Sequence, residues 1–429
     1  MEFIKKLDNL NIYLIAALPF ALATGPAIIE IFVFLIISIF FLTKKSIKFD
    51  RFDYYILLFY VVLVISSLLS SFKLSSLSSS FFLIRFIILY FVIKNYFTSE
   101  HRIKIINLTF TILCIVFIIL IVDGYYQYFL NLSLFGTELS TDQRMIMHLR
   151  KDEFIMGSYF SKMIPIFLSI WFFKFNELNL KKNLFLGTLF ILAFYCMVLS
   201  GDRAATFLSI GYLIGLIVLY NNNIFYKFLS IGFIFIIIFI SLIIFPSVKD
   251  RYIDQTIQEV LGKNDESVLK DESILRNKNS ISKIFNLKKD GKNIYIFSTA
   301  HESHIRIALN MFLDNPLIGV GPNNFRKLCS DKKYAVHLDR GCTTHPHHIL
   351  SQILAETGIL GFIFYLIVLL YIIRKLFIHL FLKNLNFNQI NLYSFYFVTL
   401  IPFLPSGNIF NNWYIYSLFI PFIFIKILR

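Results

Sequence analysis

Twelve apolar runs follow one another along this chain of 429 residues, and its charged side chains lie mainly between them. Each run has roughly 15 to 23 residues, enough for a helix to cross about 30 Å of hydrocarbon. Inside a bilayer every backbone N–H and C=O group needs an internal hydrogen bond, so such runs fold as helices. The sequence therefore predicts an all-α polytopic membrane protein of about twelve spans. They lie at 11–25, 27–43, 54–72, 79–97, 104–122, 157–174, 183–200, 203–220, 224–246, 350–373, 390–404 and 409–427.

The composition agrees with this class of protein. Hydrophobic residues make up 57% of the chain and the mean hydropathy is +0.70, both typical of integral membrane proteins. The formal net charge of +15 does not indicate nucleic-acid binding, because the chain has no basic soluble domain with interleaved aromatic residues. The first ten residues hold Glu2, Lys5, Lys6 and Asp8, so we expect no cleavable signal peptide.

Positive charges are unevenly distributed over the short loops, and this predicts the orientation of the spans. With a cytoplasmic N-terminus, the loops on the inner side are rich in Lys and Arg, as at Lys44, Lys45 and Arg51. The outer loops at 25–26 and 405–408 hold neither residue. This positive-inside pattern predicts that both termini are cytoplasmic.

One long outer segment separates the ninth span from the tenth and divides the chain. We expect nine spans before it, a large and mostly helical loop, and three spans after it. The corresponding ranges are 1–246, 247–347 and 348–429.

Two parts of this loop have distinct patterns. Residues 259–292 are charged and poor in aromatic side chains, which indicates a surface excursion. Residues 300–313 predict an amphipathic helix that Asn315-Pro316 ends. Its apolar face is expected to consist of Ile305, Ala308, Leu309 and Phe312.

Ionisable residues that border the spans gather toward the outer side, where charged groups are functional candidates. Arg85 lies about two turns into the fourth span and Asp123 ends the fifth; the alternative for both is snorkelling or structural pairing. Arg203 follows Asp202 in the tight outer turn between the seventh and eighth spans. The alternative there is a salt bridge between these two residues that fixes the turn.

Three imidazoles and a carboxylate lie where the long loop re-enters the membrane, in the segment His345-Pro-His-His-Ile-Leu-Ser-Gln-Ile-Leu-Ala-Glu-Thr-Gly358. On a helix that begins near His347, residues His348, Gln352 and Glu356 recur every four positions and share one face. His347 and Glu356 are nine residues apart and point to nearly opposite sides. We therefore expect Glu356 to anchor the helix and His347 to project into the cavity that the loop covers.

The histidines admit three interpretations. A general base is favoured, because only histidine has an unperturbed pKa near neutrality. A zinc site would need a further ligand beside His345, His347 and His348, and the only one nearby is Cys342, so we expect no metal. The third interpretation is a purely structural role. Cys342 is instead predicted to form a disulfide with Cys329 in an oxidising compartment, the alternative being two free thiols.

Three motifs carry a resemblance to a known family. The first is His347-His348, followed after nine residues by Gly358-x-x-Gly361. The second is Arg306 upstream of Asn315-Pro-Leu-Ile-Gly-Val-Gly321, and the third is Arg203 in Ser200-Gly-Asp-Arg-Ala204. Together they resemble the O-antigen ligase family, in which a His-Asn pair precedes the two glycines and twelve spans hold one large outer loop. His348 stands where the family usually has Asn.

The resemblance implies a metal-independent, inverting glycosyltransferase without a cofactor. His347 would take the proton of the acceptor hydroxyl, and Arg203 and Arg306 would hold the diphosphate of the donor. Gly358 and Gly361 would allow close approach of a second helix. The remaining supporting residues would be His348, Glu356, Arg85 and Asp202.

The resemblance also implies the partners. The donor would be an undecaprenyl diphosphate-linked glycan, and the acceptor a sugar hydroxyl of lipid A-core. Both are lipids, and no nucleic acid is expected. The protein would lie in the bacterial inner membrane among its lipids, with the active site facing the periplasm.

Two other functions remain open. A polymerase of the same superfamily, which joins repeat units on the same carrier, shares these motifs. A secondary transporter would also fit twelve spans, but its polar sites should lie near the bilayer midplane on broken helices. Here they gather at the outer side.

Overall fold

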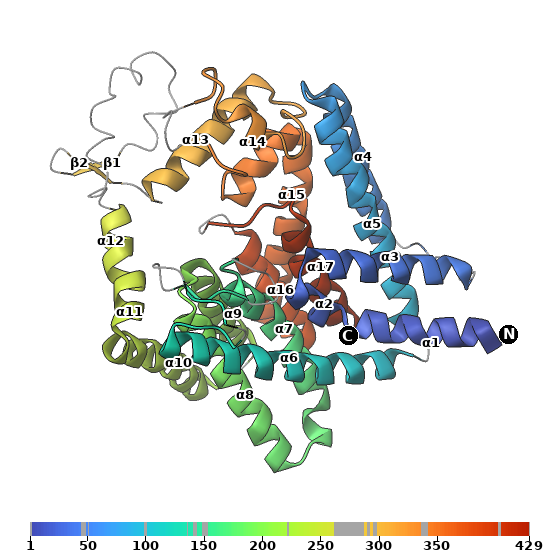
Figure 1. Ribbon diagram of the computed structural model, residues 1–429, viewed down its shortest axis with the longest axis vertical. Helices are drawn as coiled ribbons and strands as arrows, with labels where there is room; N and C mark the ends of the chain where they lie inside the picture. The colour runs from blue at the N-terminus through green and yellow to red at the C-terminus, as the bar shows by residue number, and fades with distance from the viewer. Residues whose placement is uncertain are drawn as a thin grey trace.

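The fold is described from a computed structural model, which is almost entirely helical (Figure 1). The described residues are 2–43, 49, 51–97, 101–134, 136–139, 144–147, 153–220, 223–260, 287–289, 292–294, 298–335, 342–401 and 405–428.

Eleven of the twelve predicted apolar runs correspond to one helix each, and the first corresponds to two helices. Before the long loop these are α1 (Glu2–Ala16), α2 (Leu18–Thr24), α3 (Pro26–Leu42), α4 (Arg51–Leu69), α5 (Lys73–Phe97), α6 (Arg102–Leu130), α7 (Met156–Lys174), α8 (Leu180–Leu199), α9 (Arg203–Tyr220) and α10 (Ile224–Ile244), with a 3-10 turn, Phe175–Glu177, after α7. After the loop they are α15 (Ile349–Leu382), α16 (Phe387–Leu400) and α17 (Asn412–Ile427).

Fewer helices than predicted runs qualify as membrane spans by length and composition. Seven described helices, α5 to α10 and α15, are long and apolar enough to cross a membrane. The first predicted span is a pair, α1 and α2, bent by 57°, and counting it as one span gives eight. The helices α3 and α4 are apolar but shorter by this measure. Twelve spans therefore remain a prediction, as does the division of the chain at 247 and 347.

The described part of the long loop is mostly helical, as predicted. It contains α11 (Pro246–Lys249), a π-helical turn (Asp250–Asp254), α12 (Gln255–Val260), α13 (Thr299–Asp314) and α14 (Phe325–Leu328). It also contains two short antiparallel strands that were not predicted, β1 (Leu287–Lys289) and β2 (Lys292–Ile294). Most of the predicted surface excursion at 259–292 lies outside the described residues.

The amphipathic helix predicted at 300–313 is confirmed as α13, which Asn315 ends as its C-cap. Ile305, Ala308 and Met311 are buried, whereas Phe312 is only half-buried. Ala308 and Met311 pack with Phe325 of α14 and with Ala355 of α15. Figure 1 shows α13 and α14 together at one end of α15, with α8 at the opposite end of the molecule.

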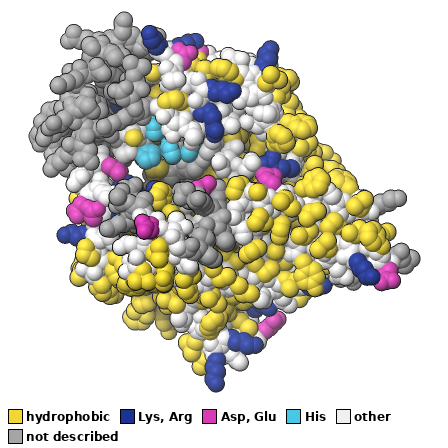
Figure 2. Space-filling view, in the orientation of Figure 1, with side chains coloured by type: hydrophobic (Ala, Val, Ile, Leu, Met, Phe, Trp, Pro, Cys, Tyr) yellow, Lys and Arg dark blue, Asp and Glu magenta, His cyan; other side chains and the backbone are white. Residues whose placement is uncertain are grey.

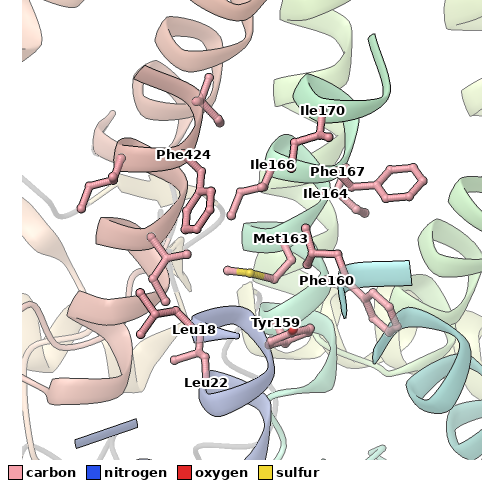
Figure 3. Close-up of a cluster of buried hydrophobic side chains, with 14 of the residues drawn as sticks. Leu18, Leu22, Tyr159, Phe160, Met163, Ile164, Ile166, Phe167, Ile170 and Phe424 are labelled. Atoms are coloured by element: carbon pink, nitrogen blue, oxygen red, sulfur yellow. The ribbon is translucent and has the colours of Figure 1, made fainter. Parts of the chain in front are cut away.

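The main hydrophobic core surrounds α7. Tyr159, Phe160, Met163 and Phe167 of this helix are fully buried. Figure 3 shows them packed between the α2 side chains Leu18 and Leu22, neighbouring helices, and Phe424 of α17. A helix that is buried on nearly all sides is apolar around its whole circumference. The one Lys within this buried part of α7 is therefore a notable exception.

Candidate active site

Four of the described histidines form one cluster between the long loop and the start of α15. His345 and His347 come from the segment before α15, and His301 and His304 from α13. The ring centroid of His347 lies 3.9 Å from that of His345, 5.3 Å from that of His301 and 5.5 Å from that of His304. Figure 2 shows the histidine side chains gathered on one face, where the surface is hollowed below α13 and α14.

The surroundings keep three of these imidazoles, those of His301, His345 and His347, neutral. Burial, followed by the nearby His301 and His304, lowers the pKa of His347 to about 4. Burial and His347 lower the pKa of His345 to about 3. Burial also lowers the pKa of His301 to about 4, helped by His304 and by the positive charge of Arg203. Near neutral pH, His347 therefore has a free lone pair and can accept a proton.

His347 is held in a backbone conformation that side chains other than glycine rarely adopt, with φ at +53°. Ser406, from the segment before α17, fixes it there. The Ser406 backbone N–H donates to the His347 carbonyl at 2.8 Å, and the Ser406 carbonyl lies 3.3 Å from Nε2 of His345. Residues held in such conformations are concentrated at functional sites, where the surrounding contacts determine them.

His348 is the N-cap of α15. Its Nδ1 accepts a hydrogen bond from the Ser351 backbone N–H at 3.3 Å. Asn is a preferred N-cap because its side-chain oxygen accepts the same bond, so an imidazole nitrogen can replace the Asn of the family motif at this position. Of the three residues predicted to share one face of this helix, Gln352 and Glu356 are hydrogen-bonded to each other, while the His348 side chain caps the helix.

Glu356 anchors α15, as predicted. Its buried carboxylate accepts one hydrogen bond from the Phe325 backbone N–H at 2.8 Å and one from Nε2 of Gln352 at 3.0 Å. The same Gln352 nitrogen donates to Asn408 at 2.6 Å. Glu356 therefore connects α14, α15 and the segment before α17, without contacting His347.

The glycine motifs bring two backbones into direct contact. Within α15, Gly358 has φ at +63° and ψ at −161°, which breaks the helix, and an added Cβ would lie 2.4 Å from the Leu317 carbonyl carbon. Facing it, a Cβ on Gly319 would lie 2.5 Å from the backbone of Glu356. The Ile359 N–H donates to the Pro316 carbonyl at 2.8 Å across this contact.

The prediction that Gly358 and Gly361 let a second helix approach is therefore wrong. The atoms nearest to an added Cβ at Gly358 belong to the backbone of the loop that follows α13, and not to a helix. At Gly361 the nearest atom to an added Cβ is Oγ1 of Thr357, one turn earlier in the same helix. Gly358 and Gly319 allow the backbone of α15 and that of the loop to approach closely at the break in α15.

A serine of α4 and the serine that directly follows this helix hold the same loop from the other side. Oγ of Ser66 donates to the carbonyls of Ile318 at 2.6 Å and Glu356 at 3.0 Å, and Oγ of Ser70 donates to the Val320 carbonyl at 2.8 Å. The segment 316–321 is thus fixed between α4 and the break in α15. Its backbone polar groups are satisfied where a loop would otherwise leave them without partners.

Arg203 lies at the start of α9 and binds α12. Its Nη2 donates to both carboxylate oxygens of Glu259, at 2.8 and 3.0 Å, and its Nη1 donates to Oγ1 of Thr256 at 2.8 Å. The alternative of a salt bridge to Asp202 is wrong, because the Asp202 carboxylate instead accepts from Ser158 at 2.7 Å and from the Ala205 N–H at 3.2 Å. The positive charge of Arg203 contributes to the lowered pKa of His301, after burial and His304.

Arg306 lies two residues after His304 on α13. Its Nη2 donates to Oε1 of Glu302 at 2.6 Å. Both side chains are largely buried, and burial raises the pKa of Glu302, although the hydrogen bond from Arg306 opposes this. Each of the two candidate phosphate-binding arginines is therefore paired with a carboxylate.

Arg85 lies apart from the histidine cluster. Its Nη2 forms a salt bridge with Glu30 of α3 at 2.8 Å, and the Tyr416 hydroxyl donates to the same Glu30 carboxylate. Asp123 accepts hydrogen bonds from Gln127 at 2.7 Å and from the Leu134 N–H at 2.8 Å. For both residues the alternative of structural pairing describes these contacts, and the hydrogen bonds of Arg85 within the described residues reach Glu30, Tyr416 and Phe82 rather than the clustered histidines.

In the structure Cys329 and Cys342 form a disulfide, with Cα atoms 4.9 Å apart. It connects the end of α14 to the segment that carries His345. Of the other two cysteines, Cys196 is buried in the core and Cys114 is half-buried.

Sequence reasoning missed His301 and His304. The signal was the run His301-Glu-Ser-His304-Ile-Arg306, because residues three apart on a helix lie on one face. Within the part of the chain that the structure describes, no group of three or more His, Cys, Asp or Glu side chains has the geometry to hold a metal ion.

The range 188–366 contains Arg203, the histidine cluster and the break in α15. Residues 188–366 match the family model of O-antigen ligases. The resemblance seen in the motifs is thereby confirmed over this range. A comparison with curated proteins finds no match.

The match to the O-antigen ligase family implies an enzyme of the glycosyltransferase type. Together with the membrane helices, it indicates a multi-pass membrane protein of lipopolysaccharide biosynthesis. It is equally compatible with ligases and polymerases of the superfamily, since the matched range contains the site that both would use.

Proposed function

We propose that this protein is an O-antigen ligase that transfers a glycan from undecaprenyl diphosphate to a sugar hydroxyl of lipid A-core. One observation carries the proposal: a neutral His347, fixed in a strained conformation, lies 5.3 Å between ring centroids from His301, whose pKa is lowered by burial, by His304 and by the positive charge of Arg203. A base is thus combined with a cation that can bind phosphate.

In the proposed reaction the acceptor oxygen attacks the anomeric carbon of the donor sugar. A new glycosidic C–O bond forms while the bond from that carbon to the diphosphate oxygen breaks, and attack from the opposite side inverts the anomeric centre. The hydroxyl proton passes to a ring nitrogen of His347. The electron pair of the broken bond stays on undecaprenyl diphosphate, and Arg203 and Arg306 stabilise this added negative charge.

The carboxylates on these arginines would leave when the donor binds. Glu259 and Glu302 occupy the guanidinium groups in the structure. Phosphate oxygens, like carboxylate oxygens, accept hydrogen bonds from a guanidinium group. The phosphates of the donor can therefore take the place of the two carboxylates. The carboxylates would then mark the positions of the phosphates.

The cellular setting follows from the reaction. Lipid-linked donors of this kind are used on the periplasmic side of the bacterial inner membrane, so the histidine cluster would face the periplasm and both termini the cytoplasm. The positive charges at the inner loops support this orientation. No nucleotide sugar is needed there, and guanidinium groups take the role that a divalent ion would otherwise fill.

A gene deletion separates ligase from polymerase. Loss of a ligase leaves bare lipid A-core and polymer retained on its carrier, whereas loss of a polymerase leaves core capped with a single repeat unit. We expect the first pattern on a lipopolysaccharide gel, and wild-type complementation should restore capped core. The second pattern would contradict the ligase and support the polymerase, while unchanged lipopolysaccharide would contradict both.

A further inference from the structure

Lys162 of α7 is a buried cation in the apolar core. Its side chain is 3% exposed, and its ammonium lies over the rings of Phe395 at 5.6 Å and Tyr414 at 5.9 Å. Among the described residues, no side chain or carbonyl accepts a hydrogen bond from this ammonium or forms a salt bridge with it. Burying an ammonium without acceptors is costly, so an acceptor from outside the chain is expected to reach it.

The position of Lys162 connects it to both halves of the site. Ser158, one turn earlier on the same face of α7, donates to Asp202, the residue before Arg203. On its other side, the Tyr414 ring lies against Gly407, where an added Cβ would come within 2.5 Å of it. Gly407 follows Ser406, which is bonded to His345 and His347.

The depth of Lys162 suits a lipid headgroup. It is six residues from the start of α7 at Met156, which corresponds to about 9 Å along the helix axis. Charged groups at this depth, facing the interior of a helix bundle, mark the paths of polar substrates. A diphosphate that enters from the surrounding lipid would reach this level below the histidine cluster.

The negative charge of the donor, once its bond to the sugar breaks, exceeds the positive charge that the two arginines supply. A lipid-linked diphosphate carries two negative charges, and a third develops when the bond to the sugar breaks. Arg203 and Arg306 supply two positive charges. Resting on the proposed function, we propose that the Lys162 ammonium is the third cation of the donor site and binds a phosphate oxygen of the polyprenyl diphosphate.

The test measures Michaelis constants for donor and acceptor with the full-length protein in lipid nanodiscs. Lys162→Met keeps the volume and removes the charge, and Lys162→Arg keeps the charge. Lys174→Met, at the other end of α7, is the matched control. We expect Lys162→Met to raise the donor KM roughly tenfold or more, the value of a hydrogen bond to a charged group. The acceptor KM and the thermal unfolding midpoint should stay at wild-type values, as should every parameter of the control, and Lys162→Arg should recover most of the donor affinity.

Two results would overturn the inference. An unchanged donor KM in Lys162→Met would show that no phosphate contacts this residue. Equal changes in the donor and acceptor constants, with a lower unfolding midpoint, would show that Lys162 only balances the charge of Asp202. Failure of the wild-type protein to use a polyprenyl diphosphate donor would instead refute the proposed function itself, and the inference with it.

Discussion

Replacing Glu259 by Gln is expected to tighten donor binding. Glu259 accepts hydrogen bonds of 2.8 and 3.0 Å from Nη2 of Arg203, the nitrogen proposed to hold the diphosphate. In the wild-type protein the donor must displace this carboxylate. A glutamine has the same shape but no charge, so it competes less strongly for the guanidinium group.

The size of the effect follows from the exposure of the pair. The Glu259 side chain is 36% exposed and that of Arg203 20%, so water screens their attraction. Ion pairs of this kind contribute about 0.2 to 1 kcal/mol, and 1 kcal/mol corresponds to about a fivefold change in affinity. We therefore expect the donor KM to fall by up to about fivefold, with the acceptor KM unchanged.

The assay is the initial rate of transfer at varied donor concentration and saturating acceptor. Glu177→Gln, in the short turn after α7, is the matched control and should leave the donor KM at the wild-type value. A donor KM that is unchanged or raised in Glu259→Gln would refute the reasoning. An unchanged value would mean that Arg203 does not bind the donor, and a raised one that Glu259 positions Arg203 rather than competing for it.

Three further predictions concern the histidines and the break in α15. Because the pKa of His347 is lowered to about 4, the base stays neutral down to about pH 5, and transfer should be lost as the pH falls through 4; a midpoint near 6.5 in the pH–rate profile would contradict the buried, neutral imidazole. His348→Asn should unfold at the wild-type temperature, while His348→Ala should lose about 1 kcal/mol of stability with its N-cap; equal unfolding midpoints for the two variants would argue against the cap. Gly358→Ala should destabilise the protein by at least roughly 1 to 3 kcal/mol, through its positive φ and its contact with Leu317. Gly232→Ala in α10, where an added Cβ meets nothing within 4 Å, serves as its control, and similar thermal unfolding of both variants would count against the backbone contact.

The helices were accessible to sequence reasoning because hydrophobic run length directly reflects the bilayer. Each predicted run has a helix, and the amphipathic pattern at 300–313 became α13. The bend between α1 and α2 was not predicted, since the run at 11–25 is continuous and only Pro19 within it hints at a break. The short strands were not predicted, because each has only three residues and a single apolar side chain, Leu287 in β1 and Ile294 in β2, so no alternation of apolar and polar residues marks them.

The site was only partly accessible, because its residues meet through tertiary contacts. The spacing of nine between His347 and Glu356 predicted that they do not form a bonded pair, and the Glu356 carboxylate is indeed bonded to Phe325 and Gln352 instead. The spacing could not show that His301 and His304 would lie beside His347, because that depends on how α13 packs against α15. Glycine spacing likewise suggested a helix contact, whereas φ at Gly358 and the approach of Leu317 reveal a broken helix filled by a loop.

The central claim is that His347 is the base of a transfer from a polyprenyl diphosphate. The most direct measurement is release of undecaprenyl diphosphate by purified His347→Ala protein, supplied with the lipid-linked glycan and lipid A-core, beside wild type and His348→Asn. The account predicts that His347→Ala folds with a wild-type unfolding midpoint and releases no diphosphate carrier above background, while His348→Asn remains active. Transfer by His347→Ala at the wild-type rate would contradict it.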